Sequence, residues 1–393
     1  MVSTPVYMDN HATTRVDPRV VDAMLPILSE HYGNPSSTSH VFGWDSREAV
    51  DKAREQVASA LGASRREIVF TSGATESNNL AIRGVARRMQ REGKHLVSVV
   101  SEHKAVLDPL ARLGREGFEI TLLPVAQQTE SCPGQIDLQK LEDAIRDETT
   151  LVSVMMANNE TGVLQMIDQV GRICKERGVL LHSDATQAVG RVRVDVEELQ
   201  VDLLSFSAHK FYGPKGVGGL YIRRRNPLVR LEPLVNGGGH EQGRRSGTLN
   251  APGIVGMATA LDLAVEEMVD ETVRIGGLRD RLFEGIEAEL ERIQLNGPPL
   301  GEDRLPGNLN ISFQDVDGEA LMMSMRDLAV ASGSACTSVD PEPSHVLRAI
   351  GLNDDQTRAS LRFGLGRFNT AEEVEFAIRQ VCGAVERLRR MRP

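Results

Sequence analysis

The chain has 393 residues, 40% of them hydrophobic and 25% charged, so it is long enough for a large core and two domains. Its net charge of −10 argues against a nucleic-acid or an anionic-membrane partner. No secretory signal is visible at the start, and no apolar stretch approaches the roughly 20 residues that span a bilayer. Four scattered cysteines argue against a disulfide framework, so we expect a reduced, cytoplasmic setting.

In chain order, a strand-like VYMD lies in irregular residues 1–15, and Asp17 and Pro18 then predict the start of a helix. From about residue 45 to 275, helical stretches alternate with short apolar runs. This alternation predicts an α/β domain with a mainly parallel sheet, whose ligand site lies beyond the carboxyl ends of the strands. The runs are residues 68–70, 95–100, 151–155, 179–182, 203–206 and 219–222.

A long amphipathic helical region at 253–293 leads out of this domain. Beyond it the pattern predicts strands at 308–313, 328–331 and 361–366 and helices near 317–327, 344–350 and 370–390. These elements make a smaller α+β domain. The predicted division is a large domain at 15–257 and a small domain at 1–14 and 258–393.

The motif Ser72-Gly73-Ala74-Thr75 lies between an apolar run and a predicted helix. Small residues let backbone N–H groups approach a phosphate at the positive end of a helix, and Thr75 adds a hydroxyl donor. An ordinary N-cap fits the same pattern, and this motif alone leaves both interpretations open.

Two polar motifs follow other apolar runs. Asp184 is costly to bury unless it pairs with a cation, such as a protonated pyridine nitrogen, and Gln187 can then donate to a phenolic oxygen of the ring. Capping of the next helix is the alternative for Asp184. His103 can stack on a ring and exchange protons near neutral pH, with a structural role as its alternative. We interpret His182 as a strand residue.

Lys210, in SFSAHKFYG, follows an apolar run, where desolvation would lower its pKa and let it form a Schiff base. Ser207 and His209 can reach phosphate oxygens there, and Lys215 is a weaker candidate for the lysine role. Cys336 lies in the Gly/Ser-rich SGSACTS, where a thiol would be accessible. The alternative is a cysteine that a loop merely tolerates.

Together these residues resemble the cysteine desulfurases that use pyridoxal 5'-phosphate (PLP) and serve iron–sulfur cluster assembly and nitrogenase maturation. The resemblance covers nearly the whole chain, and the set of motifs in this order is highly specific. Its motifs are YMDNHATT at 7–14, GNPSS at 33–37, ANNETG at 157–162, GGGHEQGRRSGT at 237–248, SGSACTS at 332–338, EPSHVLRAIGL at 342–352 and LRFGLGRF at 361–368.

The resemblance implies the aminotransferase-like fold of type I, in a homodimer with both active sites at the interface. It also implies that Lys210 holds PLP, while His103 stacks on the ring, Asp184 pairs with its nitrogen and Gln187 meets its phenolic oxygen. The phosphate contacts would come from Ala74, Thr75, Ser207 and His209, and from Thr248 toward the partner subunit's phosphate. The substrate contacts would come from Asn34, Asn159 and Arg362, whose planar fork matches a carboxylate.

The implied activity converts L-cysteine to L-alanine and leaves the sulfur as a persulfide on Cys336. An acceptor, such as an iron–sulfur scaffold protein, would then take the sulfur. No resident metal is expected, with Cys336 as a transient iron–sulfur cluster ligand at most. Two alternatives stay open: a selenocysteine lyase or another PLP lyase or transferase acting on an amino acid, and a docking platform for sulfur delivery.

Two of the departures from the family pattern concern the site and its partners. His11 stands where small or hydroxyl residues are common, so we expect a different contact near the site entrance. The sequence ends at Pro393, whereas many relatives continue into a tail that docks the scaffold protein. We therefore expect the scaffold contact to differ.

Overall fold

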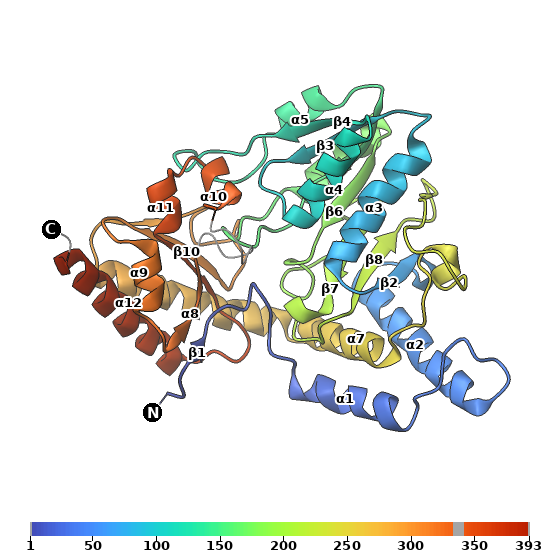
Figure 1. The fold of residues 1–393 in the computed structure, drawn as a ribbon, viewed down its shortest axis with the longest axis horizontal. Coiled ribbons are helices and arrows are strands. Elements are labelled where there is room, and N and C mark those ends of the chain that lie inside the picture. Colours follow the sequence, from blue (N-terminus) through green and yellow to red (C-terminus); the bar gives the residue numbers. More distant parts are fainter. Residues whose placement is uncertain (1, 333–341, 392–393) are drawn as a thin grey trace.

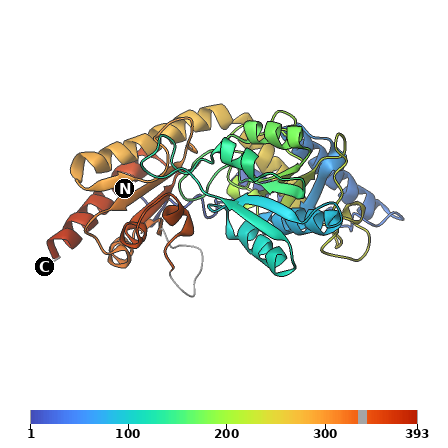
Figure 2. The ribbon, with the colours of Figure 1, turned by 90° about the horizontal axis from the view of Figure 1, so that it is seen from above.

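A computed structural model describes residues 2–332 and 342–391, which form two bodies side by side (Figure 1; Figure 2). The larger body contains a seven-stranded sheet in the order β2-β8-β7-β6-β5-β3-β4. Strand β8 is antiparallel to β2 and β7, and the other pairs are parallel. The strands are β2 (Ile68–Thr71), β3 (His95–Val99), β4 (Glu119–Leu123), β5 (Thr149–Ser153), β6 (Leu180–Asp184), β7 (Leu203–Ser207) and β8 (Gly218–Ile222).

The sheet confirms the predicted α/β class and all six apolar runs. The pattern missed β4, because this edge strand is largely uncovered and its side chains do not form an apolar run. Each face of the sheet has its own hydrophobic cluster. Helices α3 (Ala74–Met89) and α4 (Lys104–Arg115) cover one face, and the other face packs against α1 (Pro18–Ser29), α2 (Val41–Ala60), α5 (Leu138–Ala144), α6 (Ile167–Arg177) and α7 (Ala251–Glu266).

The smaller body has a third hydrophobic cluster and an antiparallel sheet in the order β12-β13-β10-β9. Its strands are β9 (Ile293–Leu295), β10 (Asn308–Phe313), β12 (Ala331–Ser332) and β13 (Ser360–Gly364). Its helices are α8 (Met268–Glu289), α9 (Gly318–Met323), α10 (His345–Ala349), α11 (Asp354–Arg358) and α12 (Ala371–Met391). The N-terminal strand β1 (Val6–Tyr7) joins this body by pairing with β11 (Leu328–Ala329). Figure 1 shows β1 beside the elements of the smaller body.

The helical region predicted at 253–293 is two helices rather than one. Helix α7 ends at Glu266 and α8 begins at Met268. Between them, the carboxylate of Glu267 pairs with Arg19 at 2.6 Å and with Arg367 at 3.1 Å. These are tertiary contacts that periodicity cannot reveal. The predicted domain boundary at 257/258 falls inside α7 and remains a prediction.

Local chemistry explains two of the helix ends. At α1, Asp17 accepts a hydrogen bond from the backbone N–H of Arg19, and Pro18 occupies the first helical position, as the sequence predicted. At α6, Gly178 ends the helix in the left-handed conformation, with φ of 69°. Within the described residues, no helix is both long and apolar enough to cross a bilayer.

Candidate active site

A cavity of about 530 Å³ opens beyond the carboxyl ends of β6 and β7, at the position that the sequence predicted. It brings together residues that lie far apart in the sequence. The predicted site residues that line it are Ala74, Thr75, His103, Asn159, Asp184, Gln187, Ser207, His209, Lys210 and Arg362, and the weaker candidate Lys215 lines it as well.

Lys210 is the last residue of a single 3-10 turn, Ala208–Lys210, that directly follows β7. Its Nζ donates to the carbonyl oxygens of His11 at 2.6 Å and Ala12 at 2.8 Å. The N-terminal segment therefore crosses to the larger body and holds the amine at the cavity wall.

Asp184 ends β6 and is almost fully buried. Its Oδ2 accepts from Asn78 Nδ2 at 2.7 Å, and its Oδ1 accepts from the backbone N–H of Thr186 at 3.0 Å. The second bond is a local turn contact of the kind that the capping alternative proposed. Asp184 nevertheless faces the cavity, where its carboxylate can meet a cationic ring nitrogen.

His103 both caps a helix and lines the cavity. It is the N-cap of α4, and its Nδ1 accepts from the backbone N–H of Ala105 at 3.0 Å. Burial is the main cause that lowers the pKa of His103. The neutral ring therefore carries its proton on Nε2, and the side chain lines the cavity. By contrast, His182 bonds Ser153 and Ser205 inside the sheet, as a strand residue should.

The opposite end of the cavity suits a phosphate. Gly73, at the N-cap of the 16-residue helix α3, has a φ of 152° that few other residues adopt. A Cβ there would make only an ordinary contact with Ser207 Oγ at 3.6 Å, so the backbone conformation rather than space favours glycine here. His209 contacts Thr13 Oγ1 at 3.1 Å, and burial lowers its pKa to about 4, so the ring is neutral at pH 7.

Arg362 enters from β13 of the smaller body and is buried. Its Nη2 pairs with Asp9 Oδ1 at 2.8 Å, and its Nη1 donates to the backbone oxygen of Asn159 at 3.0 Å. Its Nε is buried without a hydrogen-bond partner among the described residues. Since Arg362 lines the cavity, its guanidinium is placed to bind an anion there.

Cys336 lies outside the described residues. Ser332 and Glu342, the described residues on either side of that segment, line a neighbouring cavity of about 360 Å³. This cavity shares His103, Asn159 and Arg362 with the first one.

Two predicted residues do not reach the cavity of their own chain. Asn34 and Thr248 are both exposed, and neither lines the site. Their predicted roles therefore depend on a second subunit.

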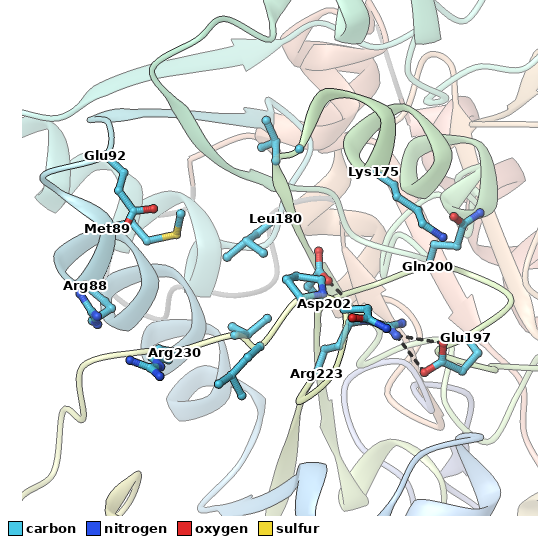
Figure 3. Close-up of a pocket in the computed structure, with 16 residues that line it drawn as sticks. Arg88, Met89, Glu92, Lys175, Leu180, Glu197, Gln200, Asp202, Arg223 and Arg230 are labelled. Atoms are coloured by element: carbon cyan, nitrogen blue, oxygen red, sulfur yellow. Dashed lines mark hydrogen bonds and ion pairs between the residues drawn. The ribbon is translucent and has the colours of Figure 1, made fainter.

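A separate cavity of about 420 Å³ lies at the amino ends of β6 and β7, away from the first cavity (Figure 3). Its central charges pair with one another. Arg223 Nη1 donates to both carboxylate oxygens of Glu197 at 2.8 and 2.9 Å, and its Nε lies 3.4 Å from Asp202 Oδ1. None of the predicted site residues lines this cavity.

Sequence reasoning missed three groups that shape the first cavity: Asp9, Asn78 and Arg191. Asn78 lies one helical turn after Ala74, and Arg191 lies four residues after Gln187. This spacing was the available signal, because side chains at i and i+4 of a helix or helical turn face the same side. The Asp9–Arg362 contact had no local signal, since 353 positions separate the two residues.

These residues fit PLP. The cavity has a lysine amine at its wall, a buried carboxylate at a strand end and a glycine-built helix N-terminus for a phosphate. Two buried polar atoms that have no hydrogen-bond partner in the described part of the chain, Asn78 Oδ1 and Thr186 Oγ1, belong to residues that line the same cavity. Fold and site thus define a PLP-dependent enzyme of the aminotransferase-like fold.

Comparisons with known proteins agree. The family model for aminotransferase class-V matches residues 6–376. The chain is 56% identical over 389 residues to the cysteine desulfurase IscS of Anaeromyxobacter dehalogenans, and the match covers 99% of this chain and 94% of that protein. A solved NifS-like protein matches with a TM-score of 0.89 and 39% identity, over 98% of this chain and 100% of that one.

A structure of SspA in complex with cysteine is also similar, with a TM-score of 0.80 and 37% identity over 94% of this chain and all of that one. The chain therefore belongs to the class-V aminotransferase family, whose cofactor is PLP, and to the cysteine desulfurases within it.

Proposed function

We propose that this protein converts L-cysteine to L-alanine and retains the sulfur as a persulfide on Cys336. The single observation that carries this proposal is that Lys210, Asp184, His103 and Arg362 meet in one cavity. The cysteine complex of the similar SspA structure supports cysteine as the substrate. The desulfurase names of the relatives support the reaction.

PLP, when bound, supplies an electron sink for an amino acid. Lys210 holds it through Nζ, and once released, Nζ moves the α-proton of the substrate. Asp184 keeps a positive charge on the ring nitrogen, and Gln187 donates to the phenolic oxygen. Ala74, Thr75, Ser207 and His209 bind the phosphate at the amino end of α3.

Arg362 Nε binds the substrate carboxylate beside Asn159, and neutral His103 exchanges a proton with the substrate. The thiolate of Cys336 then attacks the substrate sulfur. A sulfur–sulfur bond forms as the carbon–sulfur bond breaks. The electron pair of the broken bond stays with the carbon skeleton, which takes up a proton and leaves as alanine.

The working form is a homodimer in the cytoplasm, and Asn34 and Thr248 complete the site of the partner subunit. Dimerisation is supported by exposed apolar side chains on α1 and α2. They are Leu25, Leu28, Val41, Phe42 and Trp44, each between 47% and 56% exposed. The persulfide passes to an acceptor protein such as an iron–sulfur scaffold.

The test quantifies alanine and sulfide together after L-cysteine is added to the purified holoenzyme. Cys336→Ala should keep the visible cofactor absorbance but lose sulfur release, because the nucleophile is gone. Lys210→Ala should lose that absorbance. Cys132→Ala is the matched control, since burial raises the pKa of this loop thiol to about 11 and it should not react. Normal turnover in Cys336→Ala would refute the persulfide role.

A further inference from the structure

The side chain of Arg191 binds three chain segments that form the inner wall of the cofactor cavity. Its Nη1 donates to Gln187 Oε1 at 2.8 Å. Its Nη2 donates to the backbone oxygens of Asn10 at 2.7 Å and Lys210 at 3.0 Å. Arg191 does not itself line the cavity. It ties together the N-terminal segment, the turn after β6 and the turn that presents Lys210.

His11, one of the expected departures from the family pattern, also contacts this guanidinium. It is buried, and its Nδ1 lies 2.5 Å from Arg191 Nη1. Since a guanidinium only donates, Nδ1 accepts and the ring proton lies on Nε2. Burial, followed by the charge of Arg191, lowers the pKa of His11 well below its usual value. The histidine is therefore neutral and lies on the inner wall, not at the site entrance.

Arg191 also determines which way the amide of Gln187 faces. Gln187 must present its oxygen to a donor-only group, so its Nε2 faces the other side. There it donates to the backbone oxygen of His11 at 2.9 Å. The same oxygen accepts from Lys210 Nζ at 2.6 Å. The amide N–H of Gln187 and the lysine amine therefore converge on one point.

The hydrogen-bond acceptors of Arg191 are all neutral: three oxygens and one imidazole nitrogen. Within residues 2–332 and 342–391, no carboxylate forms an ion pair with it, and burial is the main cause that lowers the pKa of Arg191, against smaller opposing effects of Tyr212 and Glu271. An uncompensated cation favours the uncharged form of a nearby amine and stabilises negative charge on a nearby oxygen. Arg191 can thus affect both Lys210 and a phenolic oxygen held by Gln187.

We propose that Arg191 is a positioning residue that fixes the amide of Gln187 and, through its uncompensated charge, keeps Lys210 and the cofactor group linked to it in the less protonated form. This inference rests on the proposed link between Lys210 and PLP. Besides His11, the other charged or titratable groups that line the cavity or act on Arg191 are Glu76, His103, Asp184, His209, Lys215, Arg362, Tyr212 and Glu271. They stay unchanged in the test below.

The experiment is a pH titration of the visible absorbance of the holoenzyme without substrate, with PLP affinity measured by equilibrium dialysis. In Arg191→Met the pH at the midpoint of the absorbance change should rise by about one unit, because the cation that opposes protonation is gone. Arg191→Lys should keep the midpoint near that of the wild type but bind PLP more weakly, since an ammonium cannot hold the three wall segments together. Arg193→Met is the control, because Arg193 is exposed and pairs with Glu198 at 2.5 Å.

An unchanged midpoint in Arg191→Met would overturn the inference, even if that variant were less stable. If Arg191→Met does not fold, Arg191→Gln decides the matter, because it removes the charge but keeps hydrogen-bonding groups. The midpoint should rise in this variant too, and an unchanged midpoint would again refute the role. A wild-type protein without any visible band would instead refute the proposed function, so the two failures are distinguishable.

Discussion

Arg362 shows how much the site depends on contacts between single residues. This arginine already holds Asp9, and its Nε has no hydrogen-bond partner among the residues that the structure describes. The carboxylate of Asp9 orients the guanidinium, and the unbonded edge remains for a substrate. A planar fork can serve two carboxylates at once, whereas an ammonium is a single point charge.

Arg362→Lys should therefore raise the KM for L-cysteine by about 10- to 100-fold, because one charged hydrogen bond with good geometry is lost. The visible cofactor spectrum should not change, since Arg362 is proposed to contact only the substrate. Steady-state kinetics and an absorbance spectrum measure the two effects. A KM within twofold of the wild type would remove Arg362 from the substrate site.

Single residues also mark the limit of sequence reasoning. The strand-end rule identified Asp184 and Lys210 correctly as cavity residues, because it depends on the order of elements alone. Their hydrogen-bond partners, Asn78 and the carbonyl oxygens of His11 and Ala12, depend on three-dimensional packing. For that reason the contact of His11 was expected at the entrance and is found at the inner wall.

At the level of elements, apolar runs predicted buried strands well, and amphipathic periodicity predicted helices but not their breaks.

Burial inside strand β6 makes protonation of a histidine unfavourable. His182 lies inside it between Ser153 and Ser205, and burial lowers its pKa to about 4. The unfolded chain binds a proton there near pH 6.5, and the folded chain does not.

The contribution of His182 to stability is therefore present above about pH 6.5 and is lost as the pH falls toward 4. When urea unfolding is measured at pH 7, 6 and 5, the free energy of unfolding should fall less steeply with falling pH in His182→Gln than in the wild type. The difference should be up to about 1.4 kcal/mol per pH unit. His31→Gln is the control, because its side chain is exposed. Equal slopes for His182→Gln and the wild type would contradict this account.

For the whole molecule, the sequence predicted an α/β body and a smaller α+β body, and the cavity lies where both contribute side chains. Which surfaces meet a second subunit is harder to predict, since exposed apolar residues look like core residues in a sequence. Leu25 and Leu28 of α1 became recognisable as surface residues only in the fold, where they are 53% and 56% exposed.

Leu28→Glu should raise the dissociation constant of the proposed dimer by about tenfold or more, because a charge would enter an apolar contact. Sedimentation velocity over a range of protein concentrations measures this change. Met323→Glu, at an exposed apolar position on α9, is the control. If Leu28→Glu sediments like the wild type at every concentration, α1 is not the interface.

The pairing of β1 with β11 has a consequence for the order in which the site forms during synthesis. Residues 6 and 7 pair with residues 328 and 329, and the backbone of Asn10 bonds to that of Gly364. A ribosome must therefore release about nine-tenths of the chain before the N-terminal segment can make all of these contacts. The segment whose His11 and Ala12 hold Lys210 is thus fully anchored only in a nearly finished protein.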